Sequence, residues 1–225
     1  MARFARDPAG DRANLLFNLP LFLELLPPPG RATLDLACGE GRLGAELERL
    51  GHHVVGVDSS PGMVAAAAEL IEAVVADAAE LPFEDGAFDL VAAFMSLQDL
   101  DHLESALREA ARVLEPSGRL CFCNLHPIAT AGRFDSREPD SPFAIVGSYF
   151  DPQRHDDVVE RDGFRITFAY VHRPLEAYVR TLERAGFLIE AIREPLPPQA
   201  YLEASPGSLR WQRVPLFLHV RALKP

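Results

Sequence analysis

The sequence has few of the features that mark several common classes of protein. Its three cysteines in 225 residues are too few for a disulfide framework. No basic stripe offsets the formal net charge of -11, which disfavours a partner with a phosphate backbone. The sequence also lacks internal repeats and low-complexity segments. We therefore expect an ordinary globular protein without a nucleic-acid partner.

Two of the cysteines, Cys121 and Cys123, lie two residues apart in an apolar run. This spacing places both side chains on one face of a strand. No second cluster supplies the remaining ligands of a metal site. We expect two small core residues and no bound metal.

Long hydrophobic runs are absent as well. Residues 15–26 are apolar, but Asn18, Pro20 and Glu24 interrupt them, and residues 27–30 end the stretch. No small-residue cleavage site follows it. We expect a short amphipathic helical element rather than a signal peptide or a membrane span. The protein is thus expected to be cytoplasmic, with no membrane partner.

What the sequence does contain is an alternation of short apolar runs with helical patterns. The runs predict strands at residues 32–37, 53–57, 73–76, 88–94, 120–125, 187–193 and 214–223. Ser60 is expected to cap the helix after the second strand, and Asp101 and Glu104 have capping-box spacing before a later one. The alternation favours a doubly wound, mostly parallel sheet of the α/β class. The proline-rich connection before the last strand is too short for a crossover helix and predicts that this strand is antiparallel.

Residues 127–172 break this rhythm. Asp162-Gly163 is a strong hairpin turn signal, and Phe164, Ile166, Phe168 and Tyr170 alternate after it. We expect an inserted β-hairpin that covers the active site. The strand–helix pattern resumes with a helix that Pro174 opens and Gly186 closes.

The segment 34–44 carries a glycine-rich motif between the first strand and the first helix. Gly39, Gly41 and Gly44 follow the pattern G-x-G-x-x-G, which allows a tight turn and a close approach of a ligand to the backbone. Asp58 follows Gly39 by 19 residues, at the end of the second strand, where it can accept hydrogen bonds from ribose hydroxyls. Nicotinamide and flavin enzymes share both features, so the motif alone leaves the cofactor open.

Asp35 distinguishes between these possibilities. A carboxylate inside the first buried strand costs free energy unless a partner compensates it. Dinucleotide enzymes usually keep this strand apolar up to the first glycine. A cationic cofactor such as S-adenosylmethionine, reached directly or through water, would compensate the charge. The alternative is that Asp35 only hydrogen-bonds the backbone of its own loop.

The pattern Asp35-x-Ala37-x-Gly39-x-Gly41 resembles the first signature motif of class I S-adenosylmethionine-dependent methyltransferases. Later segments are similar to further signatures of this family, in the same order: residues 54–60 with Met63, 77–78, 81–89 and 112–118. The likeness covers residues 32–125 strongly and 173–197 loosely. It implies a Rossmann-like, seven-stranded sheet in a single methyltransferase domain over residues 1–225. Within it we expect an N-terminal helical cap (1–30), a cofactor-binding core (31–126), a substrate-covering insert (127–172) and a C-terminal αββ part of the core (173–225).

The resemblance also implies the cofactor site. Asp58 would bind the ribose and Asp77-Ala78 the adenine edge, while Met63 packs on adenine. The backbone of residues 39–41 would face the methionine part. The complete expected set is Asp35, Ala37, Gly39, Gly41, Asp58, Ser59, Met63, Asp77, Ala78 and Phe94. Ala37 replaces a more common glycine and fits only if its φ angle is not positive.

The expected reaction is transfer of a methyl group by in-line displacement, in which the protein mainly orients the reactants. Orientation can supply about 7–11 kcal/mol and a general base roughly 10²–10⁴-fold, so a base is optional. His126, after the fifth strand, is the first candidate for a base, followed by Asp99, Asp101, His102 and His172. We expect Asp99, Tyr149, Tyr170 and His172 to contact the substrate; Phe150 is a further aromatic candidate. For the histidines the alternative is a capping role, and for the aromatic residues it is the core of the hairpin.

Two other functions remain open from the sequence. One is an NAD(P)-dependent oxidoreductase on a similar nucleotide-binding fold, and the other is a non-catalytic regulator that binds S-adenosylmethionine. The acceptor is expected to be a small molecule, but no motif selects oxygen, nitrogen, carbon or sulfur as the methylated atom.

Overall fold

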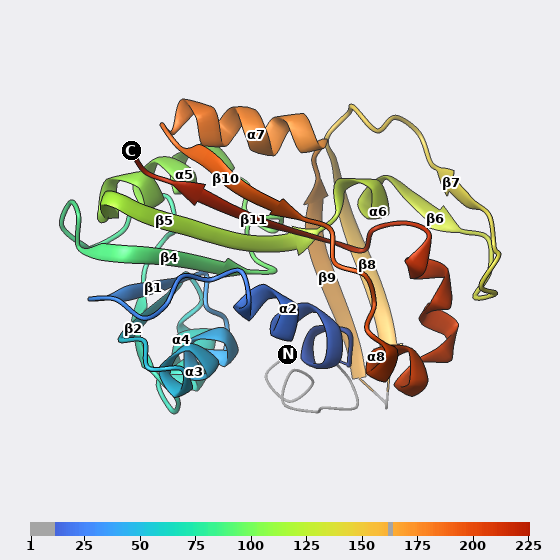
Figure 1. Cartoon of the computed structure of the whole chain (residues 1–225), viewed down its shortest axis with the longest axis horizontal. Helices are drawn as coiled ribbons and strands as arrows, with labels where there is room; N and C mark the ends of the chain where they lie inside the picture. The colour runs from blue at the N-terminus through green and yellow to red at the C-terminus, as the bar shows by residue number, and fades with distance from the viewer. Residues whose placement is uncertain (1–11, 162–163) are drawn as a thin grey trace.

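A seven-stranded sheet forms the centre of the computed structural model, which describes residues 12–161 and 164–225 (Figure 1). The strand order is β10-β11-β5-β4-β1-β2-β3. The strands are β1 (Thr33–Leu36), β2 (Val54–Asp58), β3 (Glu72–Val75), β4 (Phe88–Phe94), β5 (Leu114–Leu125), β10 (Leu188–Arg193) and β11 (Phe217–Leu223). Strand β11 pairs antiparallel with both neighbours, and the pairings among β1 to β5 are parallel. The predicted mostly parallel sheet with an antiparallel last strand is therefore confirmed.

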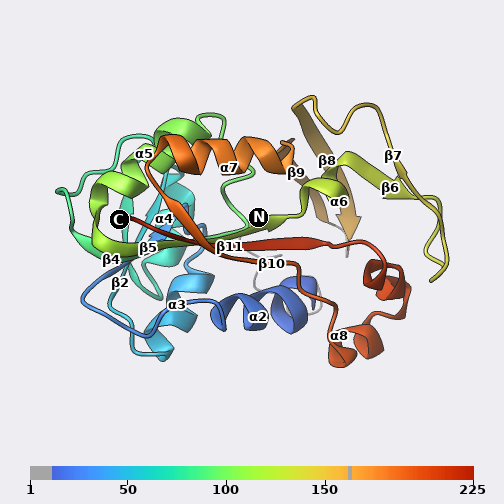
Figure 2. The ribbon, with the colours of Figure 1, turned by 45° about the horizontal axis from the view of Figure 1, so that its top comes forward.

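Helices cover both faces of the sheet (Figures 1 and 2). Helices α5 (Leu103–Val113) and α7 (Leu175–Arg184) pack on one face, and α2 (Leu19–Leu23), α3 (Arg42–Arg49) and α4 (Pro61–Ala67) pack on the other. Along β4, Val91 and Ala93 face the first layer, while Leu90 and Ala92 face the second. A strand buried on both sides has no polar face, which explains why the β4 segment is nearly all apolar.

Local signals in the sequence predicted one helix cap correctly and another wrongly. The side chain of Ser60 accepts a hydrogen bond from the backbone N–H of Met63 at the start of α4. The expected capping box at Asp101 and Glu104 does not form, because His102 occupies the N-cap position of α5 without a side-chain cap. Instead, Asp101 accepts a hydrogen bond from the Arg154 guanidinium, a long-range partner that helix spacing cannot reveal.

The insert follows a short helix, α6 (Pro127–Ala131), and consists of two hairpins. One pairs β6 (Gly132–Phe134) with β7 (Phe143–Ile145), and the other pairs β8 (Gln153–Arg161) with β9 (Phe164–His172). The second is the predicted hairpin, although its turn residues, Asp162 and Gly163, lie outside the described residues, as do the side chains of 157–168. Figure 1 shows it beside the carboxyl end of β5.

Several short elements were not predicted. The first hairpin is one, and α8 (Gln199–Ala204) and the 3₁₀ helix η2 (Pro206–Gln212), which precede β11, are two more. Each is too short to show a hydrophobic period. Cys121 and Cys123 are fully buried, as expected of core residues. No helix within the described residues is long and apolar enough to cross a membrane.

A buried polar contact attaches the N-terminal segment to the sheet. The π-helical turn η1 (Asn14–Asn18) leads into α2, and the Nε2–H of His219 on β11 donates to Oδ1 of Asn18 at 2.7 Å. The amide nitrogen of Asn18 donates to Oδ1 of Asn14 at 3.0 Å. Both Asn18 and His219 are inaccessible to solvent, and burial lowers the pKa of His219 to about 4.

This contact predicts a pH-dependent stability. Between pH 4 and 6.5 the folded protein binds fewer protons than the unfolded chain, because His219 stays neutral only when folded. Its contribution is therefore fully present above the unfolded pKa and is lost as the pH falls toward 4, by up to about 3 kcal/mol. Urea unfolding between pH 7.5 and 4.5 measures this loss. The variant His219→Gln, which retains a donor for Asn18, should show a shallower dependence.

The exposed His53 provides the control. His53→Gln should leave the pH dependence of the wild type unchanged, because the solvated side chain has no buried partner to lose. Equal slopes for the wild type and His219→Gln would contradict the prediction.

Candidate active site

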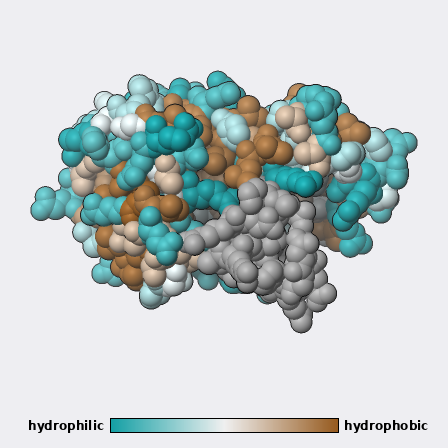
Figure 3. Space-filling model, turned by 90° about the horizontal axis from the view of Figure 1, so that it is seen from below, coloured by the Kyte–Doolittle hydropathy of each residue, from teal (hydrophilic) through white to brown (hydrophobic). Residues whose placement is uncertain are grey.

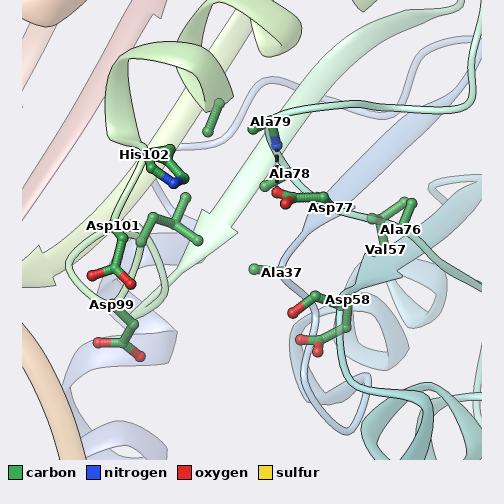
Figure 4. Close-up of a pocket in the computed structure, with 13 residues that line it drawn as sticks. Ala37, Val57, Asp58, Ala76, Asp77, Ala78, Ala79, Asp99, Asp101 and His102 are labelled. Atoms are coloured by element: carbon green, nitrogen blue, oxygen red, sulfur yellow. Dashed lines mark hydrogen bonds between the residues drawn. The ribbon is translucent and has the colours of Figure 1, made fainter.

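A pocket of about 220 Å³ opens at the carboxyl ends of the parallel strands (Figure 4), where ligands bind in open α/β sheets. Of the residues expected in the cofactor site, five line it: Ala37, Asp58, Ser59, Asp77 and Ala78. The candidate substrate residue Asp99 lines the pocket too, with Asp101 and His102 beside it. In Figure 4, Asp58 and Asp77 lie on one side and Asp99 and Asp101 on the other. The structure therefore brings together residues from the ends of four strands.

The glycine-rich motif forms the loop between β1 and α3. Gly39 and Gly41 have φ angles of 55° and 78°, which favour glycine. A Cβ on Gly39 would meet no atom within 4 Å, so the backbone there is open to a ligand. At Gly44, in contrast, a Cβ would lie 2.6 Å from Cδ1 of Ile71 and 3.2 Å from Oδ2 of Asp35. The third glycine is thus required for close packing rather than for ligand access.

Ala37 departs from the expectation stated for it. Its φ angle is +54°, although an alanine in place of the usual glycine was expected to fit only without a positive angle. The left-handed conformation costs a residue with a Cβ about 1–2 kcal/mol. Met95, directly after β4, has a φ of +57°. Two strained residues thus follow the two central strands at the pocket end of the sheet, and such strain is concentrated at functional sites.

Backbone hydrogen bonds hold the carboxylates of Asp58 and Asp77, which lie together on one side of the pocket. Oδ2 of Asp58 accepts from the N–H of Gly39 at 3.0 Å and Oδ1 from the N–H of Ser60 at 2.9 Å. Oδ1 of Asp77 accepts from the N–H of Ala79 at 2.8 Å. Asp58 thereby connects the end of β2 to the glycine-rich loop, and among the described residues no cationic side chain forms an ion pair with either carboxylate.

Asp35 lies beneath the loop and does not line the pocket. Its Oδ2 accepts from the N–H of Gly44 at 2.9 Å, and the residue is 1% exposed. Burial raises the pKa of Asp35 to about 7, the hydrogen bond from Gly44 opposes this, and the nearby charge of Asp58 adds to it. The loop hydrogen bond that was one of the two alternatives for Asp35 is present, and compensation by a cationic cofactor stays a prediction.

The other side of the pocket is a loop after β4, which residues of β5, of β9 and of the segment before α7 hold in place. Oε1 of Gln98 accepts from the N–H of Leu125 at 2.7 Å, and its backbone carbonyl accepts from the N–H of Val171 at 2.9 Å. The guanidinium of Arg173 donates to the carbonyls of Gln98 and Leu100. Gln98 and Arg173 were not predicted, since neither belongs to a motif.

Asp99 projects from this loop. It is exposed to the pocket, but the protein atoms around it displace enough water to raise its pKa to about 7, against the lowering effects of a hydrogen bond with Gln98 and of the Arg173 charge. Such a value suits a group that exchanges protons near neutral pH.

The histidines predicted near the substrate have structural partners. Nδ1 of His126 accepts from the N–H of Ile128 at 3.1 Å as the N-cap of α6, and its Nε2 lies 2.9 Å from Oε1 of Glu194. Burial lowers the pKa of His126, and the Glu194 charge opposes this. His172 is hydrogen-bonded to Oγ1 of Thr130 at 2.7 Å and to the carbonyl of Tyr149 at 2.9 Å. Neither histidine lines the pocket.

The remaining predicted residues also lie outside the pocket lining. The hydroxyl of Tyr149 accepts from the N–H of Leu175 at 3.0 Å, where α7 begins. The ring of Tyr170 stacks on His155 at 5.0 Å. Met63 is half-buried on α4, and the ring of Phe94 packs 5.6 Å from that of Phe22. Contacts of these residues with a cofactor or a substrate stay predictions.

The strain at Ala37 gives a stability prediction. Ala37→Gly should raise the free energy of unfolding by about 0.5–1 kcal/mol, because relief of the left-handed strain exceeds the entropy that glycine adds to the unfolded chain. Urea unfolding measures the change. Ala65→Gly, on the exposed face of α4, is the control and should lower stability by about 1 kcal/mol. A loss of stability in both variants would show that Ala37 is not strained.

The pKa of Asp99 gives a second prediction. A ¹³C NMR titration should place the midpoint of its carboxyl signal near 7, and the signal is assigned by its loss in Asp99→Asn. In Arg173→Gln the midpoint should rise, since the removed charge stabilises the carboxylate. A wild-type midpoint of about 4, the ordinary value for aspartate, would show that the site does not perturb this group.

Comparisons with known proteins show what this chain is similar to. Residues 34–122 match the profile of a family described as "Methyltransferase domain". Over 96 residues the chain is 44% identical to the demethylmenaquinone methyltransferase of Mycolicibacterium paratuberculosis, and over 98 residues it is 41% identical to that of Corynebacterium kroppenstedtii. These alignments cover 42% and 43% of the chain and the same shares of the relatives. The chain thus aligns with less than half the length of either relative.

The likeness of the structures extends over most of the chain. A crystal structure of an S-adenosylmethionine-dependent methyltransferase from Mesorhizobium loti has a TM-score of 0.76 at 25% identity and covers 91% of this chain and 96% of its own. The fold of a glycopeptide N-methyltransferase, MtfA, solved with S-adenosylmethionine, is similar at a TM-score of 0.65 and 18% identity over 93% and 94% of the chains. The predicted resemblance is therefore confirmed: residues 34–122 match a methyltransferase domain, and the sheet around them has the fold of class I S-adenosylmethionine-dependent methyltransferases.

Proposed function

We propose that this chain transfers a methyl group from S-adenosylmethionine to a small-molecule acceptor. One observation carries the proposal: Ala37 at the start of the glycine-rich loop, Asp58 at the end of β2 and Asp77 after β3 line one pocket. The family match of residues 34–122 and the similar structures of S-adenosylmethionine-dependent enzymes support the same cofactor.

The residues at the pocket fit this cofactor. The open backbone at Gly39 allows a ligand to approach the loop, since no side chain occupies the space above it. The carboxylates of Asp58 and Asp77 are acceptors for ribose hydroxyls and for the amino group of adenine. Asp35, whose buried charge no described cationic side chain compensates, would be stabilised by a cation above the loop.

The charge of the pocket favours the same choice. Asp58, Asp77, Asp99 and Asp101 line it, and no lysine or arginine is among the described lining residues. S-adenosylmethionine carries an ammonium group and a sulfonium, whose methyl group is the electrophile that the cofactor supplies. A nicotinamide dinucleotide would bring two negative charges on its pyrophosphate into an acidic pocket. The electrostatics therefore oppose the oxidoreductase alternative.

The residues of the protein would act mainly by orientation. The loop after β4 holds Asp99 opposite Asp58, and the hydrogen bonds of Gln98 and Arg173 fix that loop. With its raised pKa, Asp99 can take up a proton that an acceptor releases. His126 remains a candidate from the sequence, but its role as the N-cap of α6 competes with proton uptake at Nδ1.

We infer that the insert covers the acceptor. Arg154 on β8 donates to Oδ1 of Asp101 at 2.7 Å, and the N–H of Val171 near the end of β9 donates a hydrogen bond to the carbonyl of Gln98. The hairpin is thereby attached to the loop that carries Asp99. A covered pocket of this size suits a small molecule better than an open nucleic-acid surface, in agreement with the net charge of -11. The expected cytoplasmic location stays a prediction, which cell fractionation tests.

Binding of the product, S-adenosylhomocysteine, tests the proposed cofactor without an acceptor. At 100 times its dissociation constant it adds about 2.7 kcal/mol to the free energy of unfolding, which raises the melting temperature by roughly 5–10 °C for a protein of this size. Asp58→Ala should largely abolish the rise. Asp151→Ala, an exposed aspartate of the insert, is the matched control and should retain it.

The outcomes separate the alternatives. No rise at millimolar S-adenosylhomocysteine, or a larger rise with a nicotinamide dinucleotide, would contradict the proposal. Once binding is shown, release of S-adenosylhomocysteine from S-adenosylmethionine is measured across a panel of acceptors. No turnover across a broad panel of acceptors would favour the alternative of a non-catalytic regulator that binds S-adenosylmethionine. A similar fold is also found in a cyclase, SpnF, at a TM-score of 0.60, so the fold alone does not establish methyl transfer.

A further inference from the structure

A second hollow, of about 450 Å³, lies away from the methyl-transfer pocket and shares no lining residue with it. It is formed where the start of the N-terminal helical segment, the connection between β6 and β7, α8 and η2 meet. Figure 3 shows that hydrophilic residues dominate this end of the molecule when it is viewed from below.

Three arginines, Arg12, Arg137 and Arg210, line this hollow. Several other arginines of this acidic chain pair with carboxylates: Arg112 contacts Glu109 at 2.8 Å, and Arg119 contacts Glu190 at 2.9 Å. Among the described residues, no carboxylate lies within 4.0 Å of the guanidinium group of Arg137 or Arg210. Within the described part of the chain, Arg137 and Arg210 therefore lie at the hollow without a paired carboxylate, although the chain as a whole carries a net charge of -11.

The side chain of Arg210 is held in place at the hollow. Its guanidinium carbon lies 5.4 Å from the ring centre of Phe134 and 5.9 Å from that of Trp211, and one terminal nitrogen donates to the carbonyl of Gly207. Its Nε is buried and has no hydrogen-bond partner among the described residues. Burial and the charge of Arg137 both lower the pKa of Arg210. These surroundings thus disfavour the charged form of Arg210, and a bound anion would stabilise that charged form.

Neutral donors lie next to the arginines. The hydroxyls of Tyr201 and Ser208 line the hollow and form a hydrogen bond of 2.9 Å to each other. A methyl group placed on Gly207 would lie 3.8 Å from Cβ and Cδ of Arg137, so the chain of Arg137 passes close to the backbone of η2. The guanidinium group of Arg210, held in place, and that of Arg137 beside it match the oxygens of phosphate and carboxylate groups.

We propose that this hollow binds a small oxyanion with at least two negative charges, such as a phosphate ester, a diphosphate or a polycarboxylate. Arg137 and Arg210 supply the charge, and the hydrogen-bonded hydroxyl pair of Tyr201 and Ser208 supplies one neutral donor. The site is separate from the methyl-transfer pocket and does not depend on the proposed function.

The single tryptophan of the sequence, Trp211, lines the hollow and reports on its occupation. Its fluorescence is followed while sodium diphosphate, inorganic phosphate or citrate is added at constant ionic strength. We expect a saturable change in this fluorescence. The anion that binds most tightly then shows whether the site prefers phosphate or carboxylate groups. Arg210→Gln and Arg137→Gln should each weaken binding by roughly tenfold or more, because each removes a charged hydrogen-bond donor.

Arg49→Gln is the matched control, since this exposed arginine is paired with Glu46 on α3, outside the hollow. It should bind the anions as the wild type does. Arg137 is exposed and forms no hydrogen bond to a described residue, so its variant tests the site even if Arg210→Gln fails to fold. No saturable change at millimolar anion, or unchanged affinity in Arg137→Gln, would overturn the proposal. Neither result depends on S-adenosylhomocysteine.

Discussion

The hydrogen bond from Gly44 to the buried carboxylate of Asp35 fixes the start of α3 against the end of β1. The glycine-rich loop between them therefore has both ends anchored, and Asp58 binds its middle through the N–H of Gly39. The close approach of α3 that this bond needs leaves no room for a side chain at Gly44. These contacts set the shape of the glycine-rich loop, which begins at the pocket residue Ala37 and leaves the backbone open at Gly39.

The central sheet was largely predictable from the sequence because its inner strands, such as β1 and β4, are buried on both faces. Burial on both sides forces continuous apolar runs such as β4, and helices between parallel strands impose the alternating rhythm. The antiparallel direction of β11 was predicted correctly, but the reason was wrong, because residues 194–216 before it are long enough to hold α8 and η2. The short elements β6, β7 and α8 lie outside this rhythm and could not be predicted, because they are defined by tertiary contacts rather than by a repeating pattern.

The two sides of the pocket also differed in how far the sequence predicted them. Asp58 and Asp77 stand directly after strands, so their place at the sheet edge follows from strand prediction alone. The other side depends on contacts across long sequence separations, such as Arg154 with Asp101 and Arg173 with Leu100. His126 and His172 fit the pattern of catalytic histidines, yet each has both ring nitrogens near polar partners. The positive φ angle of Ala37 could not be predicted from the sequence either, since an alanine at this position predicted an angle that is not positive.

The position of β11 has a consequence for the order of folding. This strand is the last in the chain but lies second from the edge of the sheet, between β5 and β10. Strand β10 therefore has no partner in the sheet until β11 has been synthesised, whereas β1 to β5 can pair as soon as they leave the ribosome. Because chains fold from the N-terminus during synthesis, the half that carries the glycine-rich loop can form first. The docking of the N-terminal helices through Asn18 must wait for His219.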